Sequence, residues 1–358
     1  GQAKGLTKND VSISLYTNNE TDNPNIDGVR FFTFYKNIFK SKSKFISGIK
    51  WVVGSVSSIF HARFSGTSIF HFHIFYTNIM ILFNLLLVKL LSGKIVLTVH
   101  DVTSFADENE STIISKFIYN LTDIVLTHNA FSKNEIIKVT SISSSNIYII
   151  PHGNYTPFIS IQNDKYNSKE KLNLPKDKTI LLFFGMIKKV KGLEILLEAF
   201  KKVVDTNSDI VLLIAGKPWE NDFDEYQKII DRNNLSKHII LHTKFIPHED
   251  VEHYYCASDL VVLPYKKIYQ SGVLMMTLSY ERPAIASNLP PLMEVISDNE
   301  NGFLFETENS NDLSDKLIEI LADKKNLEIV RKKGIELINT KYGWDEIGRL
   351  TKLAYETL

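Results

Sequence analysis

The segment FFGMIKKVKGLEILLEAF, residues 183–200, places a glycine and three lysines between an expected strand and an expected helix. A glycine directly after a strand lets the backbone come close to a ligand, which a side chain would prevent. The N-terminus of the following helix offers free N–H groups and a positive dipole end to an anion. Lys188, Lys189 and Lys191 add positive charge at the same place. The pattern favours a phosphate-binding loop, and a turn with solvated lysines is the alternative.

A second candidate anion site lies in YQSGVLMMTLSYERPAIAS, residues 269–287. The expected helix begins at Ser271-Gly272-Val273 and ends before Pro283. Its first N–H groups have no partner within the helix, so they can bind an anion. The body of this helix, residues 272–280, is apolar and carries no charge.

The elements that must position these residues alternate between short β-branched runs and helical patterns. The expected strands cover residues 11–17, 67–75, 94–100, 123–129, 146–151, 179–185, 209–216, 238–246, 258–265 and 282–287. The expected helices cover residues 78–91, 111–121, 191–204, 222–234, 250–256, 272–280 and 310–321. The alternation predicts an α/β protein with two doubly wound halves, and the polar stretch 155–178 is expected to be a linker. Ligands of such sheets bind at the carboxyl ends of the strands.

The length of 358 residues and the overall composition fit two globular domains. The 41 Lys and Arg balance the 41 Asp and Glu, so no global charge favours nucleic acid as a partner. The single cysteine, Cys256, fits a reducing compartment. The most apolar run, residues 79–91, is shorter than the ~20 residues of a transmembrane helix. The N-terminus shows no apolar signal-peptide core, and we expect a cytoplasmic protein.

Three segments of the second half resemble one known family. Residues 183–200 resemble the Gly-x5-Lys-Gly strand-loop-helix of the nucleotide-sugar domain in GT-B glycosyltransferases, specifically glycosyltransferase family 4. KFIPHEDVEHYYCASDLVVLPY, residues 244–265, resembles the loop-helix-strand of that domain that ends in Asp, apolar residues and Pro. RPAIASNLPPLMEVISDNENGFLF, residues 282–305, resembles its segment with Glu-Val-Ile followed by Gly-Phe. The resemblance is strongest over residues 179–306.

The resemblance implies a GT-B fold, with two Rossmann-like domains facing a central cleft. The domains would be residues 1–157, which bind the acceptor, and residues 158–341, which bind the donor. Residues 342–358 would form a terminal helix that crosses back to the first domain. The implied reaction transfers a sugar from a nucleoside diphosphate sugar to a saccharide or polyprenyl-linked saccharide, with retention and without a metal ion or other cofactor.

The donor site follows from the matched positions. Gly185 would let the backbone approach the donor, and Lys188 and Lys191 would contact the diphosphate. Lys191 would also act in catalysis by stabilising the leaving group. Glu294 would reach the nucleoside, or would instead cap the next helix. The full expected donor site is Gly185, Lys188, Lys191, Gly216, Phe245, Ile246, Ser271, Gly272, Val273 and Glu294.

The chain departs from the family pattern at three positions. Met186 stands where many relatives carry an arginine. Ile268 and Met276 stand near the positions of two glutamates that many relatives carry eight residues apart. These replacements leave the donor sugar open. They keep open the alternative of a non-catalytic glycosyltransferase-like binding subunit. A second alternative, a nucleotide-sugar 2-epimerase, shares the fold but would need acid/base carboxylates, and the acid-poor stretch 266–280 argues against it.

Histidines supply the candidate chemistry of the first half. LTVHD (97–101) and IIPHGNY (149–155) resemble strand-end histidine motifs of the acceptor domains in these enzymes. His100 and Asp101 are therefore the expected catalytic pair, and His100 and His152 are the expected acceptor-binding residues. Each histidine could instead stabilise a strand end or a turn.

Three further histidines are expected to be structural. His71 and His73 share one strand face, but no third ligand is in view for a metal. His128 ends a strand, and packing is its expected role.

The stretch FYKNIFKSKSKFISGIKW, residues 34–51, carries five lysines and no acid. We expect it either to contact an anionic membrane surface at the inner face of the membrane or to form an amphipathic helix with a solvated lysine face. The expected partners are thus a nucleotide sugar donor, a saccharide or lipid-linked acceptor and possible peripheral membrane contact, without nucleic acid.

Overall fold

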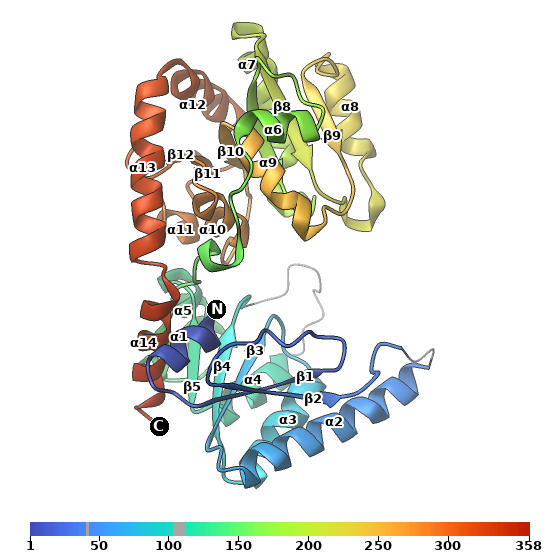
Figure 1. Cartoon of the computed structure of the whole chain (residues 1–358), viewed down its shortest axis with the longest axis vertical. Coiled ribbons are helices and arrows are strands. Elements are labelled where there is room, and N and C mark those ends of the chain that lie inside the picture. The colour runs from blue at the N-terminus through green and yellow to red at the C-terminus, as the bar shows by residue number, and fades with distance from the viewer. Residues whose placement is uncertain (41–42, 103–111) are drawn as a thin grey trace. The chain divides into compact units, whose positions relative to one another are not determined.

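The computed structural model describes residues 1–40, 43–102 and 112–358 (Figure 1). The chain divides into two compact units. Unit 1 comprises residues 1–153 together with 343–358, and unit 2 comprises residues 154–342. The sequence-based boundaries differ slightly, with the first domain ending at residue 157 and the terminal helix beginning at residue 342.

Unit 2 contains a six-stranded parallel sheet in the order β12-β11-β10-β7-β8-β9. Its strands are β7 (Thr179–Phe184), β8 (Ile210–Ala215), β9 (Ile239–His242), β10 (Leu260–Leu263), β11 (Ala284–Ser287) and β12 (Phe303–Phe305). Its helices are α6 (Lys165–Lys171), α7 (Leu193–Thr206), α8 (Asp224–Arg232), α9 (Val251–Ala257), α10 (Gly272–Ser279), α11 (Pro290–Met293), α12 (Ser310–Ala322) and α13 (Lys324–Thr340).

Helices cover both faces of this sheet, so its central strands are apolar on both sides. In β7, Ile180 and Leu182 belong to one core, and Leu181 and Phe183 belong to the other. The apolar stripe of α7 closes the second core, and α10 packs into the first. The carboxyl ends of the strands are thereby left as the edge where loops can form a site.

Unit 1 contains a four-stranded parallel sheet, β3-β4-β5-β6, and a separate two-stranded parallel sheet, β1-β2. Its strands are β1 (Ile13–Asn18), β2 (Val29–Tyr35), β3 (Ile69–Ile74), β4 (Lys94–Val99), β5 (Ile124–Thr127) and β6 (Ile147–Ile149). Its helices are α1 (Gln2–Lys8), α2 (Lys44–Phe64), α3 (Ile79–Leu90), α4 (Thr112–Leu121), α5 (Ala130–Val139) and α14 (Trp344–Tyr355).

Several elements differ from the sequence-based prediction. The stretch 34–51 is not one element, because β2 ends at Tyr35 and α2 begins at Lys44. The expected linker 155–178 contains α6, which packs against α9. Helix α13 was not predicted, since its sequence is mostly polar and buries only Val330, Gly334 and Ile338. No helix in the described part of the chain is both long and apolar enough to cross a membrane.

The contact between α1 and α14 depends on two glycines. A Cβ atom on Gly348 would lie 2.1 Å from the carbonyl carbon of Gly5. Side-chain bonds reinforce this approach, with Lys8 paired to Asp345 at 2.8 Å and Gln2 donating to Thr351 at 3.1 Å. The two ends of the described chain therefore meet within unit 1.

We predict that Gly348→Ala destabilises unit 1, because the added methyl group meets backbone atoms that cannot move aside. The expected loss is about 1–3 kcal/mol of unfolding free energy, with faster hydrogen exchange in α1. Gly48→Ala is the matched control, since Gly48 lies in α2 and a Cβ atom there would meet nothing within 4 Å. Alanine at this position should stabilise the helix by up to about 1 kcal/mol. Equal thermal stability of the two variants would contradict this packing.

Candidate functional site

The loop between β7 and α7 forms the centre of the candidate site. Gly185 follows β7 with a left-handed φ of +98° and donates its N–H to the Ala215 carbonyl at 2.9 Å. The chain then makes a short 3₁₀ turn over Lys189–Lys191. Gly192, also left-handed, is the N-cap of α7. The glycines at both ends of the loop adopt a conformation that other residues reach only with strain.

Three predicted site residues meet at Gly185. A Cβ atom placed on Gly185 would lie 3.0 Å from Lys191 Nζ and 3.5 Å from Val273 Cγ2. Val273 is the second residue of α10, whose N-cap Ser271 accepts the Leu274 N–H at 3.0 Å. The N–H groups of Gly272 and Val273 are left without acceptors inside the helix. The predicted loop and the predicted helix mouth therefore form one site, with a bare backbone segment at its centre.

Lys191 is a half-buried cation. Burial, with a smaller effect of the Lys188 charge, lowers the pKa of Lys191 to about 8. Its Nζ lies 5.4 Å from the centroid of the Tyr265 ring, and Lys188 Nζ lies 4.2 Å from the Trp219 ring. Lys189, in contrast, is exposed and pairs with Glu225 at 3.5 Å. A ligand anion beside Lys191 would supply the negative charge that stabilises its protonated form.

Close backbone contacts hold this arrangement. A Cβ atom on Gly216, at the end of β8, would lie 2.0 Å from the Gly185 carbonyl oxygen. A Cβ atom on Gly192 would lie 1.9 Å from the Pro264 carbonyl oxygen. Gly216 therefore lets β8 approach the loop, which is a structural role in addition to its predicted place at the donor.

The remaining predicted donor residues lie on two other loops. Phe245, after β9, has 74% of its surface exposed, whereas Ile246 is buried in the core. Glu294 is exposed and occupies the C-cap position of α11. The next helix, α12, is capped by Asn309, so the expectation that Glu294 caps it is wrong. The reason is that residues 295–309 contain a turn and β12 before that helix begins.

The two positions that carry glutamates in many relatives are apolar here and pack against the core of unit 2. Ile268 and Met276 are both partly buried against that core. Met276 lies on α10, which carries no charged side chain along its length. Neither Ile268 nor Met276 can therefore provide a carboxylate to bind a ligand or transfer a proton.

Several histidines of unit 1 lie at or near the carboxyl ends of its parallel strands. His100 follows β4, and its two ring nitrogens lie 3.1 Å from His73 Nδ1 and 3.1 Å from His128 Nε2. His152 Nδ1 donates to the Gly153 carbonyl at 2.7 Å, and Asp101 is partly buried beside His100. The sequence alone does not point to His73 and His128 as functional residues, because the register of β3, β4 and β5 is what brings their rings to His100.

Within the described residues, no group of three or more His, Cys, Asp or Glu side chains has the geometry to hold a metal ion.

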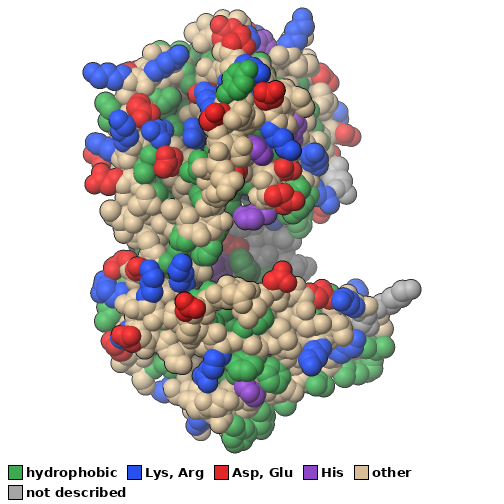
Figure 2. Space-filling model, in the orientation of Figure 1, with side chains coloured by type: hydrophobic (Ala, Val, Ile, Leu, Met, Phe, Trp, Pro, Cys, Tyr) green, Lys and Arg blue, Asp and Glu red, His purple; other side chains and the backbone are tan. Residues whose placement is uncertain are grey.

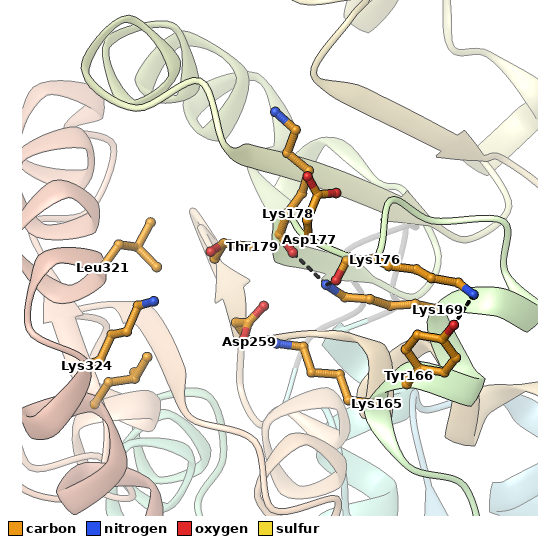
Figure 3. A pocket seen from close by; sticks show the side chains of 11 residues that line it. Lys165, Tyr166, Lys169, Lys176, Asp177, Lys178, Thr179, Asp259, Leu321 and Lys324 are labelled. Carbon is orange, nitrogen blue, oxygen red and sulfur yellow. Dashed lines mark hydrogen bonds and ion pairs between the residues drawn. The ribbon is translucent and has the colours of Figure 1, made fainter.

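A separate hollow of about 450 Å³ in unit 2 is lined by lysines (Figure 3). It lies at Thr179, the amino end of β7, and hence at the opposite edge of the sheet from Gly185. Lys165 pairs with Asp259 there, and Lys169 donates to backbone carbonyls. Because these amines already have partners, the hollow is a weaker anion site than the loop at Gly185.

Comparison with known proteins finds a family model that matches most of unit 2. Residues 164–337 match the family described as "Glycosyl transferases group 1". A lipopolysaccharide 1,2-N-acetylglucosaminetransferase of Salmonella typhimurium is 26% identical over 211 residues, which cover 57% of this chain and 54% of the relative. The capsular polysaccharide biosynthesis glycosyltransferase CapM of Staphylococcus aureus is 24% identical over 234 residues, or 63% of this chain and 60% of CapM. The chain spans about half the length of the first curated relatives it matches.

Solved structures confirm the predicted GT-B fold. Anabaena HepE, determined in complex with UDP, superposes with a TM-score of 0.76 at 14% identity, covering 97% of this chain and 100% of HepE. A glycosyltransferase from Rickettsia africae gives a TM-score of 0.76 at 16% identity, covering 99% and 92% of the two chains. At these identities the likeness concerns the fold.

The pKa of Lys191 predicts that anion affinity depends on pH. The amine is protonated below about pH 8 and neutral above it, so an anion loses this partner as the pH rises. We expect the Kd for UDP to increase between about pH 7.5 and about pH 9, by up to about tenfold for each pH unit. Calorimetric titration measures this. Lys191→Arg stays charged throughout, so its Kd should be nearly flat, and identical pH profiles for the two proteins would contradict the assignment.

Proposed function

We propose that this chain transfers a sugar from a nucleoside diphosphate sugar to a hydroxyl group of a saccharide or lipid-linked saccharide, since residues 164–337 match the model of the group 1 glycosyl transferases. The convergence of Gly185, Lys191 Nζ and the N-terminus of α10 carries the proposal. A diphosphate fits this site because it is a dianionic group that can take a cation and two backbone N–H groups together.

The same groups support the chemical step. Breaking the bond to the anomeric carbon puts negative charge on the departing diphosphate, which Lys191, Lys188 and the amides of α10 would stabilise. These protein cations supply the charge compensation that a metal ion would otherwise supply, so we propose metal-independent transfer. The departing oxygen would accept the proton of the acceptor hydroxyl on the same face of the sugar, which gives retention.

The nucleoside would lie toward the loop after β9. Phe245 presents an exposed aromatic ring there, and aromatic rings stack on nucleobases. Exposed Glu294 is a candidate for the ribose hydroxyls, because Ile268 and Met276 cannot supply carboxylates. A 2-epimerase would need acid/base carboxylates near the sugar, and these two apolar positions favour glycosyl transfer over epimerisation.

A panel of UDP-, GDP-, CMP- and dTDP-sugars, each with methyl glycosides as acceptors, tests the activity. Release of nucleotide that increases with glycoside concentration is the expected result. Nucleotide binding without release would favour the non-catalytic binding subunit. Absence of both binding and release across the panel would overturn the proposed function.

We predict that Lys191→Ala weakens binding of the active nucleotide sugar by about 1.5–3 kcal/mol, since it removes a charge-assisted bond to phosphate. Lys189→Ala is the matched control, because Lys189 lies two residues away but is exposed and paired with Glu225. Its removal should change the Kd by less than about threefold. Calorimetry on the full chain measures both values. Equal affinities of the two variants would remove Lys191 from the site.

We further propose that unit 1 contacts an anionic membrane surface through α2, at the inner face of the membrane. The inward side of α2 carries mostly small residues together with Ile59, and Gly54 packs close to Tyr35 at the end of β2. Its outward side carries large apolar residues, including Phe45, Ile49 and Val53, with 77%, 50% and 59% of their surfaces exposed. Figure 2 shows hydrophobic side chains on the surface where α2 lies. The exposed apolar side of α2 favours membrane contact over the alternative of a helix with a solvated lysine face.

An exposed apolar stripe next to lysines is typical of a helix that lies in a lipid interface. We predict that Phe45→Glu lowers the fraction of protein that sediments with vesicles of phosphatidylglycerol and phosphatidylcholine by about tenfold, as expected from the loss of one buried aromatic side chain. Ile329→Glu, at an exposed apolar residue of α13 in unit 2, is the control and should sediment like the parent. Unchanged sedimentation of the Phe45→Glu variant would contradict membrane contact through α2.

A further inference from the structure

Three histidines of unit 1 form a continuous hydrogen-bonded chain across adjacent strands. His73 lies on β3, His100 directly follows β4 and His128 directly follows β5. His73 Nδ1 lies 3.1 Å from His100 Nε2, and His100 Nδ1 lies 3.1 Å from His128 Nε2. The parallel register that pairs His73 with Thr98 and Thr98 with Leu126 brings the three rings to one side of the sheet.

The hydrogen bond between His128 and the backbone fixes which nitrogen donates in each histidine–histidine bond. His128 Nδ1 lies 3.0 Å from the Ile150 carbonyl oxygen, which can only accept, so this nitrogen carries the hydrogen. Burial lowers the pKa of His128 to about 3 and the pKa of His100 to about 4, so both rings are neutral. Each neutral ring has one donor and one acceptor. His100 therefore donates from Nδ1, and it accepts at Nε2 from the Nδ1–H of His73.

The consequence is an unprotonated Nε2 on His73, at the exposed end of the chain. The His73 ring also stacks on the ring of His71, with 4.7 Å between the centroids. His71 is itself fixed by Tyr355 Oη and Thr98 Oγ1, each at 2.6 Å. His73 thus presents a hydrogen-bond acceptor of fixed position and fixed tautomer.

We propose that His73 binds a substrate hydroxyl through its Nε2, and that His128 is a positioning residue that keeps this nitrogen unprotonated. A hydroxyl fits because it can donate to the imidazole lone pair, whereas a phosphate or carboxylate oxygen can only accept. The proposal rests on the glycosyl transfer proposed above only for the identity of the hydroxyl as that of a saccharide. It also changes the role expected of His100. Both of its ring nitrogens bind other histidines, so His100 does not bind the substrate through its ring and instead links the tautomer of His73 to that of His128.

The first test measures the tautomers directly and does not depend on activity. In the full chain labelled with ¹⁵N-histidine, two-bond ¹H–¹⁵N correlation spectra should show His73, His100 and His128 as Nδ1–H tautomers. This form is the less populated one for histidine free in water. His128→Leu removes the acceptor and should return His73 and His100 toward the Nε2–H form. His128→Gln keeps an oxygen acceptor and should preserve the parental tautomers. An Nε2–H tautomer on His73 in the parent, or no change in His128→Leu, would overturn the proposal.

The second test asks whether the presented nitrogen binds a hydroxyl. With the nucleotide sugar and methyl glycoside that react in the panel, His73→Leu should raise the KM for the glycoside at least about tenfold. The Kd for UDP should stay unchanged. His73→Gln, which keeps an acceptor at the same distance from the backbone, should recover most of this loss. An unchanged glycoside KM in His73→Leu would overturn the role of His73. If no pair reacts, the proposed function fails, and the tautomer spectra still decide whether the histidine chain exists.

Discussion

Backbone contacts that only glycine permits determine the candidate donor site. The Gly185 carbonyl meets the Cα of Gly216, and the Pro264 carbonyl meets Gly192, at distances where a Cβ atom would overlap the oxygen. These contacts bring the ends of β7, β8 and β10 together and turn the loop back so that Lys191 Nζ lies over Gly185. The lysine is thus placed by the packing of the backbone around it, before any ligand is bound.

This placement has an electrostatic consequence. Lys191 loses part of its hydration, and its positive neighbour Lys188 further lowers its pKa, which falls to about 8. A diphosphate would reverse both effects by returning a counter-charge to the amine. The first amides of α10, which have no acceptors inside the helix, lie near the same point, so one anion can bind the amine and the helix N-terminus together. Unit 1 supplies a different kind of group, a neutral acceptor on His73 that suits a hydroxyl.

The sequence predicts the parts of this structure that depend on local patterns. The strands from β7 to β11 follow from apolar β-branched runs, and Gly185, Lys191 and Ser271 follow from glycine, lysine and N-cap positions beside them. Helices α6 and α13 escape such prediction because their sequences are polar and their stability comes from a few tertiary contacts. The histidine chain escapes it for another reason. His73, His100 and His128 lie far apart in sequence, and only the register of β3, β4 and β5 brings their rings within hydrogen-bonding distance. The apolar packing of Ile268 and Met276 likewise depends on the core that surrounds them.

The central claim is that unit 2 holds the diphosphate of a nucleotide sugar at Gly185, Lys191 and the N-terminus of α10. A crystal structure of the full chain with UDP tests this most directly. If the diphosphate binds there, phosphate oxygens will lie within hydrogen-bonding distance of Lys191 Nζ and of the backbone N–H groups of Gly272 or Val273. A UDP molecule bound elsewhere, such as in the lysine-lined hollow at the amino end of β7, with the loop at Gly185 left without phosphate, would contradict it.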